Sequence, residues 1–164
     1  MAKKAKAKKV QPIPQGYHAV TAYLSVQNGA QALDYYKRAF GAKELVRMPM
    51  PDGKVGHAEV KIGDSHVMLA DEMPSMGFLG PQSRGGTTVQ LHLYVTDVDA
   101  TVQKAVAAGG KLTRPVEDKF YGDRAGTVED PFGHVWYIAT HKEELSPSEI
   151  RKRAEEEMKK RPAG

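Results

Sequence analysis

The sequence predicts an α+β fold in which one strand–helix–strand–strand–strand (βαβββ) unit occurs twice. Strand and helix patterns of apolar residues follow one another in the same order in both halves of the chain. A constant spacing of 69 residues pairs Val26 with Val95 near the start of the units and Leu69 with Ile138 near their end. The length of 164 residues suffices for one domain with its own core.

The first unit is bounded by strong cap and turn signals. A helix is expected from residue 28 or 29 to Phe40, with Gly41 as its C-cap. Turn-forming residues occupy 51–54 (Pro-Asp-Gly-Lys) and 63–65 (Gly-Asp-Ser). The remaining runs predict strands at 19–27, 42–49, 56–63 and 66–71.

The second unit follows an irregular segment, 72–87, that is rich in Gly, Pro, Ser and Met. Its pattern predicts a strand at 88–95, a helix at 97–108 and strands at 111–116, 123–129 and 134–140. Ser146 and Glu149 form a capping box with Pro147 at the first helical position, which predicts a charged terminal helix to about residue 160. We therefore expect a flexible basic arm at 1–16, one domain at 17–141 (modules 18–72 and 87–141), and a helical segment at 142–164.

Each predicted strand has one aliphatic face and one polar or aromatic face. In the first strand, Leu24 and Val26 share a face, whereas Tyr23 lies on the other. Apolar stripes at helical spacing, on residues 33, 36 and 40 and on residues 98, 102 and 105, predict that helices cover the aliphatic faces. The opposite faces suit either a ligand cavity or an ordinary solvated side of a sheet.

Composition limits the class of protein. The formal charge is +4, but residues 1–10 contain five lysines and no acid, and without them it is −1. A nucleic-acid-binding role is therefore not expected, beyond non-specific contacts of the arm with phosphates. Cysteine is absent, and no apolar run approaches the roughly 18 residues of a membrane span. We expect a cytoplasmic protein that does not enter a membrane.

Four stretches resemble the vicinal-oxygen-chelate (glyoxalase/bleomycin-resistance/extradiol-dioxygenase) superfamily: residues 23–26 (YLSV), 34–42 (DYYKRAFGA), 93–99 (LYVTDVD) and 130–136 (DPFGHVW). Residues 56–59 (GHAE) and 120–124 (FYGDR) resemble its PhnB-like branch. The resemblance implies two βαβββ modules that form a cupped mixed sheet around a cavity, with the helices on the outer face. It also implies a homodimer.

Enzymes of this superfamily hold a divalent metal at four equivalent strand positions. By resemblance, and through the 69-residue spacing, these positions fall on Thr21, Met68, Gln90 and Tyr137. None of them is an imidazole or a carboxylate, the ligands that such metals prefer. The usual metal is therefore not expected, and no cofactor is predicted beyond a divalent metal at another place.

His57, Glu59 and His92 are candidates for such a relocated metal site. His57 and Glu59 lie two apart on one strand and point to the same face, and His92 lies on the matching face of the second module. Together they resemble a two-His-one-carboxylate set. The alternatives are pairing with neighbouring strands, or a metal-free site in which Glu59 or His57 is a catalytic general base.

Other side chains are candidates for ligand binding: Tyr23, Met68, Gln90, His92, Tyr94, Arg124 and Tyr137. For the tyrosines, the alternative is ordinary packing in a sheet. Arg124 is suited to an anionic ligand, but a structural ion pair is the favoured alternative. His134 follows a turn and is expected to be a turn or surface residue.

Three functions remain open. The first is a protein that binds a small oxygenated ligand without the family metal. The second is a lyase, isomerase or dioxygenase with a relocated His/Glu metal or a metal-free base. The third is an assembly or nucleic-acid role for the basic arm and the terminal helix.

Overall fold

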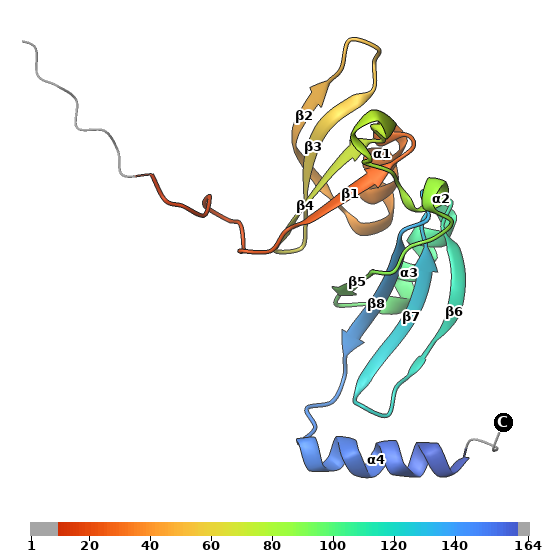
Figure 1. Cartoon of the computed structure of the whole chain (residues 1–164). Helices are drawn as coiled ribbons and strands as arrows, with labels where there is room; N and C mark the ends of the chain where they lie inside the picture. Colours follow the sequence, from red (N-terminus) through yellow and green to blue (C-terminus); the bar gives the residue numbers. More distant parts are fainter. Residues whose placement is uncertain (1–9, 161–164) are drawn as a thin grey trace, which may run out of the picture.

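The computed structural model describes residues 10–160, and it confirms the repeated βαβββ unit (Figure 1). The first module contains β1 (Ala22–Val26), α1 (Gly29–Phe40), β2 (Lys43–Pro49), β3 (Val55–Ile62) and β4 (Ser65–Asp71). The second contains β5 (Gln90–Tyr94), α3 (Val98–Ala107), β6 (Lys111–Asp118), β7 (Asp123–Glu129) and β8 (Val135–His141). The five arm lysines and residues 161–164 lie outside the described range.

Each module forms its own four-stranded mixed sheet. The strand orders are β1-β4-β3-β2 and β5-β8-β7-β6, with β1–β4 and β5–β8 parallel and the other pairs antiparallel. The predicted α+β class is thus confirmed, with the eight strands divided between two sheets. The spacing of 69 residues also appears in the register, because Tyr23 lies opposite Met68 and His92 lies opposite Tyr137.

Both module helices begin at a side-chain cap. Asn28 caps α1 by accepting a hydrogen bond from the backbone N–H of Gln31 (3.0 Å), and Asp97 caps α3 by accepting from Ala100 (2.9 Å). Helix α1 ends at Gly41 with φ 65°, a left-handed conformation that costs glycine little. The predicted bounds of α1 are therefore correct.

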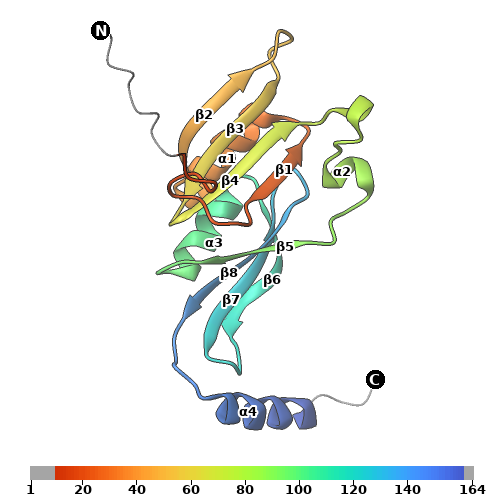
Figure 2. The ribbon, with the colours of Figure 1, turned by 60° about the vertical axis from the view of Figure 1, so that its left-hand side comes forward.

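The linker between the modules contains more structure than its composition predicts. It holds a 3₁₀ turn, η1 (Pro74–Met76), and a short helix, α2 (Pro81–Arg84). The carboxylate of Glu72 accepts hydrogen bonds from the Gly80 N–H (2.7 Å) and the Ser83 hydroxyl (3.0 Å). These bonds hold the linker against the end of the first sheet, where α2 lies beside the end of β1 (Figure 2).

The two modules are joined by one buried cluster, which we call the module joint: Tyr36, Phe40, Asp130, Phe132 and Trp136. Helices α1 and α3 pack together, and the aromatic rings of α1 pack against Phe132 and Trp136. The buried carboxylate of Asp130 accepts hydrogen bonds from the Tyr36 hydroxyl (2.7 Å) and from the Trp136 indole N–H (2.9 Å). The aliphatic sheet faces and the helical stripes thus meet in one core.

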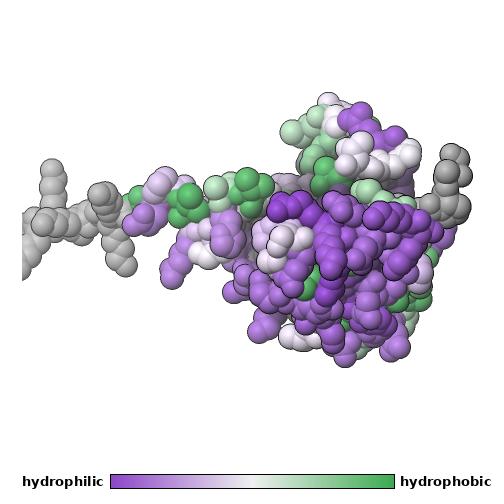
Figure 3. Space-filling model, turned by 90° about the horizontal axis from the view of Figure 1, so that it is seen from below, coloured by the Kyte–Doolittle hydropathy of each residue, from purple (hydrophilic) through white to green (hydrophobic). Residues whose placement is uncertain are grey.

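The C-terminal helix α4 (Pro147–Lys160) forms where the capping box predicts it. The Ser146 hydroxyl accepts from the Glu149 N–H (3.3 Å), and the Glu149 carboxylate accepts from the Ser146 N–H (2.8 Å). None of its residues is buried, and the surface at this end of the molecule is mainly hydrophilic (Figure 3). Among residues 10–160, no helix is long and apolar enough to cross a membrane.

Replacing Asp130 by alanine should strongly destabilise the fold. The substitution leaves the buried hydroxyl of Tyr36 and the indole N–H of Trp136 without an acceptor, which should lower the free energy of unfolding by ~3 kcal/mol. Urea denaturation measures this change. Asp34→Ala, which removes an exposed pair with Arg38, is the control and should cost ~0.5 kcal/mol or less. A similar small loss in both variants would contradict the role given to Asp130.

Candidate functional site

Four side chains share the face of the first sheet that α1 leaves uncovered. The register aligns Tyr23 of β1 with Met68 of β4, and Met68 with Glu59 of β3. His57 lies two residues before Glu59 and therefore points to the same side. The structure thus brings together four of the residues predicted for the site, all from module one.

These side chains form a continuous chain of hydrogen bonds, which we call the relay: Tyr23, His57 and Glu59. The Tyr23 hydroxyl is 2.7 Å from His57 Nδ1, and His57 Nε2 is 3.0 Å from Glu59 Oε1. An ionised carboxylate only accepts hydrogen bonds, so Nε2 carries the proton, and Nδ1 of the neutral ring accepts from Tyr23. The relay is therefore a phenol, an imidazole and a carboxylate in series.

Tyr17 completes the environment of the carboxylate. Its hydroxyl donates to Glu59 Oε2, and its ring stacks on His66 with 4.1 Å between the ring centroids. Both oxygens of Glu59 are thus engaged, one by His57 and one by Tyr17. Sequence reasoning missed Tyr17 because it precedes the first strand and no periodic pattern includes it.

Tyr23 is the exposed end of the relay, with 44% of its surface accessible. Partial burial raises the pKa of the Tyr23 hydroxyl above its usual value of 10.0. The group therefore remains a protonated phenol at neutral pH, so it can donate its proton to His57 while its oxygen accepts a hydrogen bond from another molecule.

The corresponding face of the second sheet is aromatic. His92 stacks on Tyr94 with 4.6 Å between the centroids, and its ring meets the edge of Tyr137 at 4.9 Å. The hydroxyl of Tyr137 is hydrogen bonded to that of Tyr121, which sequence reasoning missed. Gln90 starts β5 opposite Val135 and is exposed.

A second hydrogen-bonded series lies beside these rings. Buried Asp123 accepts from the Tyr94 hydroxyl (3.0 Å) and lies 2.7 Å from His141 Nδ1, while His141 Nε2 is 3.2 Å from Glu144. The bond to Asp123, followed by the bond to Glu144, raises the pKa of His141. The alternating pattern of β7 gives no sign that Asp123 is buried, and His141 follows the last predicted strand.

Arg124 does not join either polar face. The register aligns it with Thr140, and so with the side of the sheet that faces α3. Its guanidinium donates two hydrogen bonds to Asp99, at 2.8 and 2.9 Å, and one to Asp118 at 3.3 Å. The structure thus shows the ion pair that was the alternative to an anion site at Arg124.

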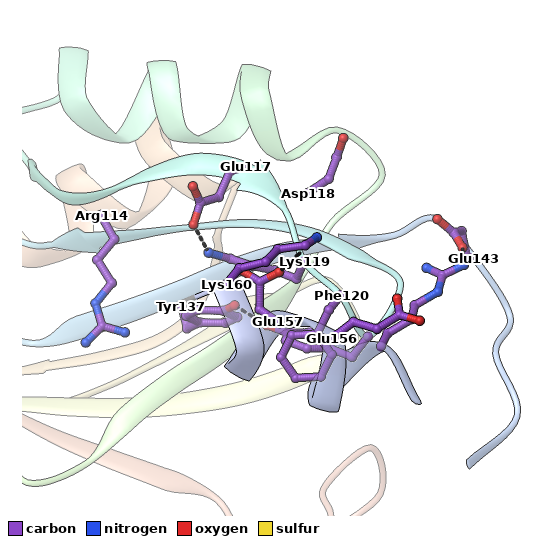
Figure 4. Close-up of a pocket in the computed structure, with 12 residues that line it drawn as sticks. Arg114, Glu117, Asp118, Lys119, Phe120, Tyr137, Glu143, Glu156, Glu157 and Lys160 are labelled. Carbon is purple, nitrogen blue, oxygen red and sulfur yellow. Dashed lines mark hydrogen bonds and ion pairs between the residues drawn. The ribbon is translucent and has the colours of Figure 1, made fainter. Parts of the chain in front are cut away.

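Two cavities adjoin the polar faces. One, of about 650 Å³, lies between α4 and the β6–β7 region and includes Tyr121 and Tyr137 (Figure 4). Charges of both signs line it, and Lys119 pairs with Glu117 at 2.6 Å. The other, of about 430 Å³, lies at the end of β1 and is bounded by Tyr23, Ser25, His134 and linker residues 78–88.

His134 contributes to the second cavity although a turn or surface role was expected. It does follow the turn, but it is partly buried, and its Nε2 donates a hydrogen bond of 2.9 Å to the backbone oxygen of Ser25. This bond joins the modules next to the cavity, a tertiary contact that the sequence of the turn does not encode.

The fold and the arrangement of the strands agree with the comparison to known families. The sequence model of the "Glyoxalase/Bleomycin resistance protein/Dioxygenase superfamily" matches residues 17–138. This chain belongs to that superfamily. Helix α4 lies beyond the matched residues.

Several members of the superfamily are similar to this chain. An uncharacterized protein of Mycobacterium tuberculosis is 45% identical over 135 residues, which cover 80% of this chain and 79% of that protein. The crystal structure of TioX from Micromonospora sp. ML1 has a TM-score of 0.60 and 30% identity, covering 74% of this chain and 96% of that one. A Bacillus cereus structure described as a PhnB protein has a TM-score of 0.60 and 17% identity, covering 75% and 99%. That last likeness concerns the fold alone.

The residues at the four superfamily metal positions do not fit a metal. Met68 lies between Tyr23 and Glu59 in the register, and the hydroxyl of Tyr137 is engaged by Tyr121. Thr21 and Gln90 complete the set, which contains no imidazole and no carboxylate. These residues therefore offer no suitable donor set for the divalent metal of the superfamily's enzymes.

The relocated set is not assembled within one chain. His57 and Glu59 are hydrogen bonded on the first sheet, whereas His92 lies on the second. Over residues 10–160, no group of three or more His, Cys, Asp and Glu side chains is placed to hold a metal ion. Within the first sheet, the geometry instead arranges His57 and Glu59 for proton transfer.

The raised pKa of His141 predicts a pH-dependent contribution to stability. The charged imidazolium is favoured in the fold, so its contribution is fully present below the unfolded pKa of about 6.5 and is lost as pH rises through the higher folded pKa. Stability of the wild type should therefore exceed that of His141→Gln by more at about pH 5 than at about pH 9.

Thermal unfolding over this pH range measures the difference, with the exposed His18→Gln as the matched control. A difference for His141→Gln that does not change with pH, or that grows as pH rises, would refute the assignment.

Proposed function

We propose that this protein binds a small oxygenated ligand over the polar face of the first sheet, without the usual metal of the superfamily. The observation that carries the proposal is the relay, whose exposed hydroxyl on Tyr23 is backed by His57 and Glu59. A plain solvated sheet face does not require a phenol, an imidazole and a carboxylate in series.

The relay supports transfer of a proton from the ligand. A ligand O–H or an acidic C–H gives its proton to the Tyr23 oxygen as the Tyr23 proton passes to His57 Nδ1. The products are a ligand anion and an imidazolium that Glu59 stabilises, so no tyrosinate forms. Glu59 has both oxygens occupied and is therefore a positioning residue, while His57 is the base and Tyr23 contacts the ligand.

We also propose that the protein is a homodimer in which the partner covers the open sheet faces. The argument is that Tyr23 and Met48 on the first sheet and Tyr94 on the second are 44%, 57% and 60% exposed. Exposed aromatic and methionine side chains around a polar site are typical of a surface that another chain covers. In such a dimer, His92 of the second sheet belongs to the same cavity as the relay.

Sedimentation equilibrium at micromolar concentration should give about twice the 18.0 kDa mass of the chain. Met48→Glu places a charge on the first sheet face and should shift the protein toward monomer, because burying an unpaired charge is costly. Met158→Glu, on exposed α4, is the matched control and should leave the mass unchanged. A wild-type monomer would sink the dimer.

The function is tested with catechol, which carries two adjacent ionisable hydroxyls. Titration should change the imidazole nitrogen signals of His57, and Tyr23→Phe should weaken binding about five- to tenfold by removing one hydrogen bond. Tyr35→Phe, which removes a buried hydroxyl without a partner, is the matched control and should bind as the wild type does. Equal affinity in Tyr23→Phe and the wild type, or an unperturbed His57, would refute the role of the relay.

A further inference from the structure

We propose that the cavity at the end of β1 binds the carboxylate of a small planar acid, with Arg84 as the anion-binding residue. This inference deepens the proposed function and rests on it for the role of Tyr23, which lines the same cavity. It assigns a substrate class, namely organic acids with an apolar or aromatic body, to a site whose proton relay alone does not specify one.

The charge of the cavity carries the first step. Its lining contains one charged side chain, that of Arg84, and no aspartate or glutamate; the other members are residues 23, 25, 78–81, 86–88 and 134. Within residues 10–160, no carboxylate lies within ion-pair distance of Arg84. A guanidinium without a counter-charge beside a concave surface favours an anion there.

The position of Arg84 is fixed by the linker. One terminal nitrogen of its guanidinium donates a hydrogen bond of 3.0 Å to the backbone oxygen of Gly77, which leaves its other N–H groups for a ligand. The nearest acid in the linker, Glu72, is already engaged by Gly80 and Ser83 and does not line the cavity. The linker therefore presents a positive charge and withholds its negative one.

The rest of the lining matches the other parts of such an acid. The rings of Tyr23 and Phe78 meet edge to face at 5.4 Å, and Leu79 and Pro81 add apolar surface, which together suit an apolar ring. The buried hydroxyl of Ser25 has no hydrogen-bond partner within the described part of the chain. Because Tyr23 belongs to both the cavity and the relay, an acid held at Arg84 contacts the side chain through which protons pass.

The cavity beside α4 shows the contrast. Its lining holds both acids and bases, and several of them form ion pairs, such as Arg153 with Glu143 at 2.8 Å (Figure 4). These pairs largely neutralise one another, so that cavity has no comparable preference for an anion. Arg114 lines it and provides a control position with the same charge as Arg84.

The experiment compares benzoate with its neutral isostere benzamide by calorimetric titration of the full chain. Benzoate should bind at least about tenfold more tightly than benzamide, and Arg84→Gln should remove this advantage, since the charge-assisted hydrogen bonds are lost. Arg84→Lys keeps the charge without the planar fork and should retain part of the advantage. Arg114→Gln should bind benzoate as the wild type does.

Three results would overturn the proposal: benzamide that binds as tightly as benzoate, benzoate affinity unchanged in Arg84→Gln, or inorganic phosphate that competes as strongly as benzoate. Matching thermal unfolding of Arg84→Gln and Arg84→Lys ensures that loss of binding does not reflect a loosened linker. Tyr23→Phe separates this inference from the proposed function. If it binds benzoate normally and its catechol affinity is also unchanged, the anion site stands and the relay fails.

Discussion

The structure depends on one buried carboxylate, that of Asp130. It accepts hydrogen bonds from Tyr36 and Trp136 and from the backbone N–H groups of Phe132 and His134. A buried charge is tolerated only when such donors surround it. Since Tyr36 belongs to α1 and the other donors to the second module, this carboxylate fixes how the modules meet. The cavity at the end of β1 exists because His134, four residues later, then reaches Ser25.

The two modules solve the same local problem with different chemistry. The carboxylate of Asp71 accepts a hydrogen bond from the first N–H of α1, at Gly29 (3.0 Å), and the hydroxyl of Thr140 accepts from the first N–H of α3, at Val98 (2.9 Å). The two acceptors are 69 residues apart, as are the two donors. Each helix is thus tied to the end of its sheet, while the polar faces have diverged into a proton relay in one module and an aromatic cluster in the other.

The fold was largely predictable because it follows from periodicity. Alternation along strands, helical stripes and the glycine at 41 are local signals, and they also predicted that His57 and Glu59 share a face. Placing His92 relative to them requires the packing of one module on the other, which no local pattern encodes. The same holds for Tyr17, which reaches Glu59 across 42 residues. Arg84 lies on a helix of four residues, too short to leave a periodic signal.

The turn between β7 and β8 is one residue longer, relative to the strand register, than the turn between β3 and β4. Ala58 lies opposite Leu69 and Gly126 lies opposite Ile138, so the repeat spacing falls from 69 to 68 on the third strand of each module. The longer turn is the one that carries Asp130 and Phe132. The halves are therefore no longer interchangeable copies: a chain built from two first modules would keep both sheets but lose the clasp between them. A one-residue change in a surface turn thus marks the point at which a duplicated unit became a single, asymmetric domain.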